Sequence, residues 1–166
     1  MNRWRWFQAV SFQIIWPTTV LGGNQWLMLP LCILLLYFIL SPCWKKDLQI
    51  IALALIGIAT DMALMQLGVF IFSEWPLWLL VLWSAFVLNF GHSLAFLRRL
   101  QVIWLILIGA VGGCYAYLAS WKLGAVELPL GLWNTSCILL VLWAIIFPLL
   151  VKADLYIREK PQRIVR

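Results

Sequence analysis

Asp61 raises the first chemical question in this sequence, because it stands alone in an apolar stretch. No other charged residue occurs between Leu48 and Ser73, and its surroundings read GIATDMALMQLG. An acidic side chain at the centre of a bilayer costs at least ~2.5–3.5 kcal/mol, so it must be partnered, hydrated or protonated. Such a group is able to bind a solute, carry a proton or hold the polar part of a ligand. Asp61 is therefore the first candidate for a functional site.

Three further polar residues have the depth needed to reach Asp61. Gln13 and Asn89 lie near the middle of their own apolar segments, and His92 follows Asn89 by about one helical turn. Asn89, His92 and Ser93 share one helical face through their i, i+3, i+4 spacing. A functional interpretation joins four residues into one intramembrane polar site: Asp61, Gln13, Asn89 and His92. The alternative makes them interhelical hydrogen bonds that fix the packing, each worth ~0.6–2 kcal/mol.

The residue patterns that most enzymes need are missing from the sequence. With a single His, the chain has no H-E-x-x-H motif and no multi-histidine cluster for a metal. It also has no G-x-S-x-G motif and no phosphate-binding Gly-Lys loop. Adjacent residues on a helix point about 100° apart, which speaks against a His92–Ser93 dyad. We therefore predict no catalytic residue, no metal and no cofactor, and we expect no independent enzyme activity.

Composition places these polar groups in a membrane. Hydrophobic residues make up 65% of the 166 residues and charged residues 11%, whereas a soluble domain carries about 25% charge. A spanning helix needs about 20 mostly apolar residues, and six segments qualify: 4–22, 26–43, 48–73, 76–97, 101–120 and 131–151. We predict an all-α, polytopic transmembrane bundle of about six helices in residues 1–151. Its short connections make consecutive helices antiparallel neighbours.

The distribution of charge predicts how this bundle is oriented. Six spans put both termini on one side, and that side receives every one of the 12 Lys and Arg residues except Lys122. Because positive residues accumulate on the cytoplasmic side, we predict that both termini are cytoplasmic. Residues 152–166 would form a basic cytoplasmic tail. Anionic lipid headgroups attract such a tail by ~1 kcal/mol per basic residue, so we expect membrane lipids and no nucleic acid as its partners.

Small residues in the fifth segment predict close helix packing. Gly109 and Gly113 form a G-x-x-x-G pattern, and Gly112, Ala116 and Ser120 repeat a small residue every four positions. Such stripes let helix backbones approach closely in a membrane. The contact is either internal to the bundle or made with a protein partner or a second copy of the chain.

Three stretches carry a resemblance to a known family. FQIIWPTTVLGG, GIATDMALMQLGVF and PLWLLVLWSAFVLNFGHSLAFL resemble the small bacterial membrane proteins grouped as domain of unknown function 2878. The similarity covers nearly the whole chain in length and helix order. It implies a multi-pass protein of the bacterial inner membrane without an assigned activity. An association of such proteins with lipid-methylating enzymes implies a helper in membrane-lipid modification.

A looser likeness concerns six-helix proteins of similar length. Gly57, Asp61, Leu67 and Gly68 resemble a pattern in the third helix of the rod-shape-determining membrane protein. The overall plan is also similar to that of vitamin-importer substrate-capture subunits. Both likenesses imply a bundle that binds a partner protein or a small solute.

Two functions follow as expectations from these observations. The leading one is a non-catalytic membrane component that binds a partner, a lipid or a small solute around Asp61. The alternative is a small-solute or proton transporter, alone or as its substrate-capture subunit.

Overall fold

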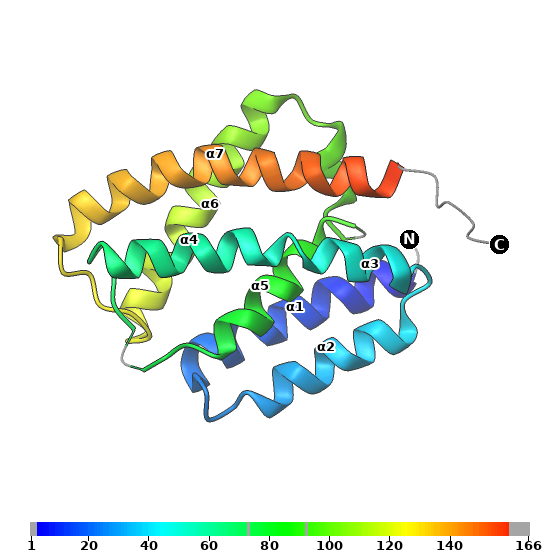
Figure 1. Cartoon of the computed structure of the whole chain (residues 1–166), viewed down its shortest axis with the longest axis horizontal. Helices are drawn as coiled ribbons and strands as arrows, with labels where there is room; N and C mark the ends of the chain where they lie inside the picture. The colour runs from blue at the N-terminus through cyan, green and yellow to red at the C-terminus, as the bar shows by residue number, and fades with distance from the viewer. Residues whose placement is uncertain (1–2, 73, 92, 160–166) are drawn as a thin grey trace.

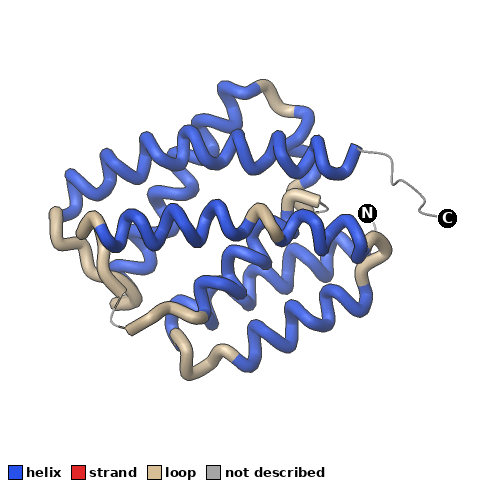
Figure 2. The backbone as a smooth tube through the Cα atoms, viewed as in Figure 1, coloured by secondary structure: helices blue, strands red, loops and turns tan. Residues whose placement is uncertain are grey.

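The structure is a computed structural model that describes residues 3–72, 74–91 and 93–159. In these residues it has seven α-helices and one 3-10 helix (Figure 1): α1 (Arg3–Gly22), α2 (Met28–Leu40), α3 (Trp44–Ile51), α4 (Ala54–Gln66), α5 (Trp78–Asn89), η1 (Ala95–Arg99), α6 (Val102–Lys122) and α7 (Gly131–Glu159). The predicted all-α bundle is confirmed. Figure 2 shows most of the loops at the two ends of the bundle.

The membrane character of the bundle follows from its helices. Three helical stretches are long and apolar enough to cross a membrane: Trp44–Gln66, which joins α3 and α4, Val102–Lys122 and Gly131–Glu159. Two shorter helices, Met28–Leu40 and Trp78–Asn89, are also apolar. Large apolar side chains such as Val111, Tyr115 and Leu149 face outward. A bilayer is the solvent that such a surface requires.

The third predicted span, 48–73, differs from the helices observed there. Helix begins earlier, at Trp44, is interrupted by a turn at residues 52–53, and ends at Gln66. The end has a physical cause, because Gly68 has φ +69° and its N–H donates to the Met65 carbonyl, while the Val69 N–H donates to that of Leu64. These two bonds form a Schellman motif that terminates a helix. Residues 67–72 and 74–77, which precede α5, are non-helical.

The non-helical stretch is held to the loop between α6 and α7. The backbones of Ile71 and Glu127 exchange two hydrogen bonds, at 3.0 and 2.8 Å. This antiparallel bridge is isolated, and no strand occurs in the residues that the structure describes. The Thr135 hydroxyl at the start of α7 also donates to the Val69 carbonyl over 3.2 Å. Residues 69–71 are therefore fixed against the α6–α7 loop and the start of α7.

The predicted glycine stripe packs inside the bundle. A Cβ at Gly109 would overlap Phe147 and the Trp143 backbone of α7, and a Cβ at Gly113 would overlap the Trp143 ring. Both glycines thus bring α6 and α7 together within one chain. A contact with a partner or second copy through α6 stays a prediction, and it would need another face of this helix.

α7 extends beyond its predicted span. Its 29 residues correspond to about 44 Å at 1.5 Å per residue, more than the ~30 Å hydrocarbon core. Residues 152–159, predicted as the start of a tail, belong to this helix. α7 ends at the end of the bundle where α1 and α3 begin (Figure 1). That this end faces the cytoplasm stays a prediction.

Candidate functional site

Asp61 is buried at the meeting point of three helices. The residue is 1% exposed. Trp83 of α5 donates its indole N–H to Oδ2 of Asp61 over 2.6 Å, and Tyr117 of α6 donates its hydroxyl to Oδ1. Because an indole nitrogen only donates, the carboxyl group supplies the acceptor that a buried Trp83 needs. Asp61 thereby links α4 to α5 and α6.

Two stacked indole rings lie beside this carboxyl group. Trp83 and Trp143 of α7 are parallel within 5°, with 5.6 Å between their ring centroids. Gly57, one turn before Asp61 on α4, faces the Trp83 ring, and Gly113 faces the Trp143 ring. A side chain at either glycine would overlap the ring. The two glycines therefore allow the aromatic pair to fill the space between α4 and α6.

A cavity of about 350 Å³ lies against Asp61. Its volume falls within the range of small-molecule sites, about 300–1,000 Å³. Apolar side chains from three helices make up most of its wall, including Phe12 and Trp16 of α1, Leu82 and Phe86 of α5, and Ile108 and Ala116 of α6. The wall also contains three hydroxyl or carboxyl side chains, from Asp61, Tyr117 and Ser120. The cavity thus suits a largely apolar occupant.

The cavity has walls from two pairs of packed helices. α1 packs against α2 and α5, whereas α6 packs against α7. Ile108 and Phe96 belong to the cavity wall and are also exposed on the outer surface. The cavity is therefore open to the outside of the bundle.

Gln13 and Asn89 do not contact the Asp61 carboxyl group. Gln13 is exposed on α1. Asn89 is buried, but its Nδ2 donates to the Ala85 carbonyl over 2.7 Å and its Oδ1 accepts from the Ser93 hydroxyl over 2.6 Å. His92 lies outside the described residues. Asn89 therefore satisfies its hydrogen bonds within its own segment.

The positions of the helix ends explain why Asp61 meets Trp83 and not Asn89. Continuous helices turning at residues 73–76 would place Asn89 opposite Asp61. The helices instead end at Gln66 and begin at Trp78. Asp61 is five residues before the first of these ends, and Trp83 is five residues after the second. A signal was available, because a Trp deep in an apolar segment needs an acceptor for its N–H.

Gln8, which the sequence did not single out, forms a separate polar junction among α1, α2 and the C-terminal end of α5. It donates to the Tyr37 hydroxyl over 2.9 Å and to the Leu88 carbonyl over 2.8 Å, and it accepts from the Ser93 N–H over 3.0 Å. It is 2% exposed. Gln8 therefore ties α1 to α2 and to the end of α5.

A second group of missed residues is an ion-pair cluster where α3, η1 and α7 meet. Asp154 of α7 accepts from Arg98 of η1 over 2.8 Å and from Arg158 over 3.0 Å. Arg158 also donates to Asp47 of α3 over 2.8 Å. Both carboxylates are fully buried. The i, i+4 spacing of Asp154 and Arg158 was the available signal.

Asp47 has further polar partners that link the cluster to α2. The hydroxyl of Tyr37 donates to Oδ2 over 3.2 Å, and that of Ser41 donates to the same atom over 2.5 Å. Lys46 donates to the Arg158 carbonyl. Each buried charge is therefore paired and hydrogen-bonded, as buried charges require, and the cluster joins α3, η1 and α7. No three His, Cys, Asp or Glu side chains gather as a metal site in the part of the chain that the structure describes.

Comparison with known proteins identifies the family of this chain but assigns it no activity. No curated protein and no solved structure matches the chain. One family matches residues 5–149, and its description is "Protein of unknown function (DUF2878)". The match covers all the helices around the cavity and most of α7. The resemblance seen in the sequence is thus confirmed, and the chain belongs to the family of unknown function DUF2878.

Proposed function

We propose that this protein is a non-catalytic component of the bacterial inner membrane that binds a lipid chain in the cavity beside Asp61. The observation that carries the proposal is an apolar cavity of about 350 Å³ that opens to the outside of the bundle. An engineered apolar cavity of ~150 Å³ binds benzene and stays dry. A cavity of about twice that volume, next to a bilayer, suits part of a hydrocarbon chain.

The role of Asp61 in this proposal is to position the cavity wall. Its carboxyl group holds the Trp83 indole and the Tyr117 hydroxyl, and both side chains line the cavity. Asp61 also lines the cavity directly. A role in membrane-lipid modification would follow if the bound lipid is presented to a partner enzyme.

The test is to fill the cavity at Gly112. This residue lines the cavity, and a Cβ there would meet nothing within 4 Å. Gly112→Phe should therefore block the cavity without disturbing the α6–α7 contact. The matched control is Val111→Phe, because Val111 is exposed on the same helix and lies outside the cavity wall.

The readout is photo-crosslinking in nanodiscs that contain a phospholipid with a diazirine in one acyl chain. The wild type and the Val111→Phe variant should give crosslinks to the α5 peptide that carries Leu82 and Phe86, which line the cavity. Gly112→Phe should lose most of them and keep those on exposed positions. Equal α5 labelling in all three proteins would refute the proposal.

The alternative, a solute or proton transporter, makes a different prediction for the same site. It requires water to reach the carboxyl group from one side of the membrane. A Cys placed at position 61 would then react with a membrane-impermeant thiol reagent from that side. A lipid-chain site predicts no such labelling.

A further inference from the structure

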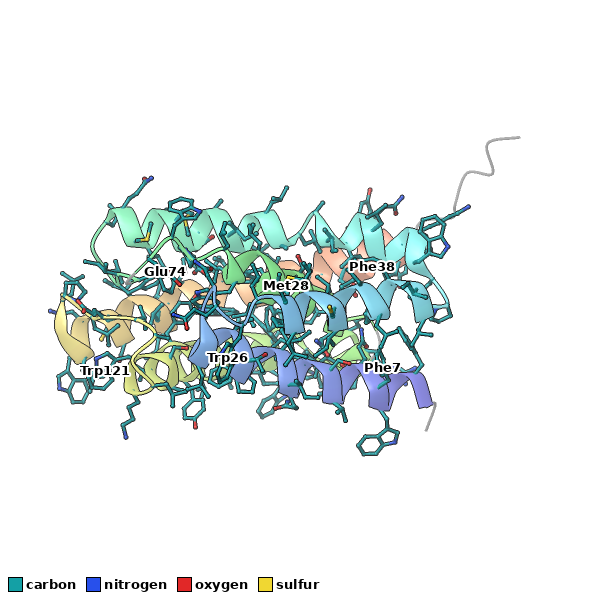
Figure 3. The ribbon with its side chains drawn as sticks, turned by 90° about the horizontal axis from the view of Figure 1, so that it is seen from below. Phe7, Trp26, Met28, Phe38, Glu74 and Trp121 are labelled. Carbon is teal, nitrogen blue, oxygen red and sulfur yellow. The ribbon has the colours of Figure 1, made fainter. Side chains whose placement is uncertain are left out.

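A second cavity adjoins the one beside Asp61 and differs from it in chemistry. It measures about 200 Å³ and lies among the α1–α2 turn, the start of α5 and the α6–α7 loop. Gly22, Gly23, Gln25 and Glu74 contribute to its wall. Figure 3 shows Glu74 and Trp26 toward the end of the bundle that also carries Trp121, away from Phe7 and Phe38. This cavity thus lies at the end opposite the ion-pair cluster.

The two cavities share part of their walls. Phe72 and Trp78 line both of them, and their rings meet edge to face with 5.4 Å between centroids. A molecule that occupied both would therefore pass beside this aromatic pair. Its apolar part would lie next to Asp61, and its polar end would lie next to Glu74.

The wall of the second cavity is held by a specific hydrogen-bond arrangement. Asn24 accepts from the Trp78 N–H over 3.2 Å and donates from Nδ2 to the Trp75 carbonyl over 2.8 Å. The Asn24 N–H also donates to Glu74 over 3.3 Å. Gly23, at φ +52°, leaves room for the Glu74 carboxylate. The α1–α2 turn and the start of α5 thus position Glu74 at the cavity.

Glu74 gives this cavity its charge. It is the only Asp, Glu, Lys, Arg or His among the described residues of the wall. No ion pair joins it to a Lys or Arg in the part of the chain that the structure describes. Glu74 is an exposed residue on this wall, and a carboxylate there favours a cation, above all an ammonium group that also donates hydrogen bonds.

We infer that the ligand is a single amphiphile with a protonated amine at its polar end, bound by Glu74, and a hydrocarbon chain in the cavity beside Asp61. The inference rests on the proposed function, since the chain must enter the larger cavity. It adds the class of headgroup and the direction in which the molecule lies. The aromatic pair formed by Phe72 and Trp78 marks the boundary between its two parts.

The experiment measures how three competitors of equal chain length displace the diazirine phospholipid from full-length protein in nanodiscs at pH 7. They are hexadecylamine, hexadecanol and palmitate. An alkylamine is protonated at this pH, as a Lys side chain is. The measured quantity is the ratio of the half-inhibitory concentrations of alcohol and amine. Comparing this ratio between variants removes differences in how the competitors partition into the bilayer.

Glu74→Gln should lower the preference for the amine about two- to five-fold, the range expected for an exposed ion pair. It should leave displacement by hexadecanol unchanged. Glu127→Gln is the matched control, because Glu127 is an acidic residue in the neighbouring loop but does not line the second cavity. This control should keep the wild-type ratio.

The possible failures are distinguishable. If wild-type α5 is not labelled at all, the lipid-chain site itself is wrong. If α5 is labelled but Glu74→Gln keeps the wild-type ratio, only the headgroup assignment is overturned. An equal change in Glu127→Gln would assign the effect to general surface charge and overturn it as well. A change in Asp61→Asn without one in Glu74→Gln would place the amine at Asp61 and reverse the inferred direction.

Discussion

The indole nitrogen of Trp83 lies 2.6 Å from a carboxyl oxygen of Asp61, and this bond joins α5 to α4 in the centre of the bundle. Tyr117 adds a second bond from α6. The acidic residue that stands out in the sequence thus has two aromatic donors as its partners. These donors also line the cavity, so the stability of the bundle and the shape of its cavity depend on the same contacts.

Replacing Asp61 should reveal how much these bonds contribute. Asp61→Ala leaves a buried indole N–H and a buried hydroxyl without partners, at a cost of about 1–3 kcal/mol each. Asp61→Asn keeps an acceptor for Trp83 and should lose less. Thermal unfolding in detergent should give the highest midpoint for the wild type, a lower one for Asp61→Asn and the lowest for Asp61→Ala. Gln13→Ala serves as the control, because Gln13 is exposed and its loss should cost less than about 0.5 kcal/mol. An equally stable Asp61→Ala variant would contradict the role of the carboxyl group.

Two glycines of α6 should respond differently to alanine. Gly109→Ala forces a methyl group against Phe147 and the Trp143 backbone, so it should destabilise by about 1–3 kcal/mol. Gly112→Ala meets open space and should stabilise the helix by about 0.5–1 kcal/mol. The midpoints of denaturation of the two variants measure this difference. If both variants unfold like the wild type, the packing of α6 against α7 is not as close as described.

Removing the shared cation of the ion-pair cluster should be costly. Arg158→Met leaves two fully buried carboxylates, Asp47 and Asp154, with less positive charge. Breaking a buried pair in this way costs about 3–5 kcal/mol. Lys152→Met removes an exposed charge from the same helix and should have little effect. Urea unfolding in mild detergent compares the two, and similar midpoints would show that the cluster adds no stability.

Gln8 and Gln13 form a matched pair on one helix. Gln8→Leu removes three hydrogen bonds that join α1 to Tyr37, Leu88 and Ser93. Each interhelical bond is worth ~0.6–2 kcal/mol in a membrane. Gln13→Leu instead adds an apolar group to a surface position and should be neutral or stabilising. Chymotrypsin resistance of α1 in nanodiscs measures both. Greater sensitivity of the Gln13 variant would reverse the assignment of the buried face.

The candidate site could be found from the sequence only in part. Asp61 is conspicuous because charge is rare in an apolar run, and its need for a partner follows from the cost of a bare carboxylate. The choice among partners depended on where α4 and α5 end. A Schellman turn at Gly68 ends α4 seven residues before the predicted limit of 73. Because of this shift, the residue opposite Asp61 is Trp83 and not Asn89. The ion pairs of Asp47 and Asp154 were missed because loop and tail charges are usually solvated.

Hydrophobicity and charge along the chain were sufficient to predict an all-helical membrane bundle, and the resemblance of three stretches predicted its family. These properties are local, because twenty apolar residues in a row satisfy their own backbone only as a helix, whatever surrounds them. Contacts between segments far apart in sequence decide three other features. They are the pairing of Asp61 with Trp83, the burial of Gln8 in place of Gln13, and the ion pairs of Arg158. A shift of a few residues at a helix end changes which side chains meet, so only the assembled bundle places the carboxyl group, the aromatic cavity and Glu74 relative to one another.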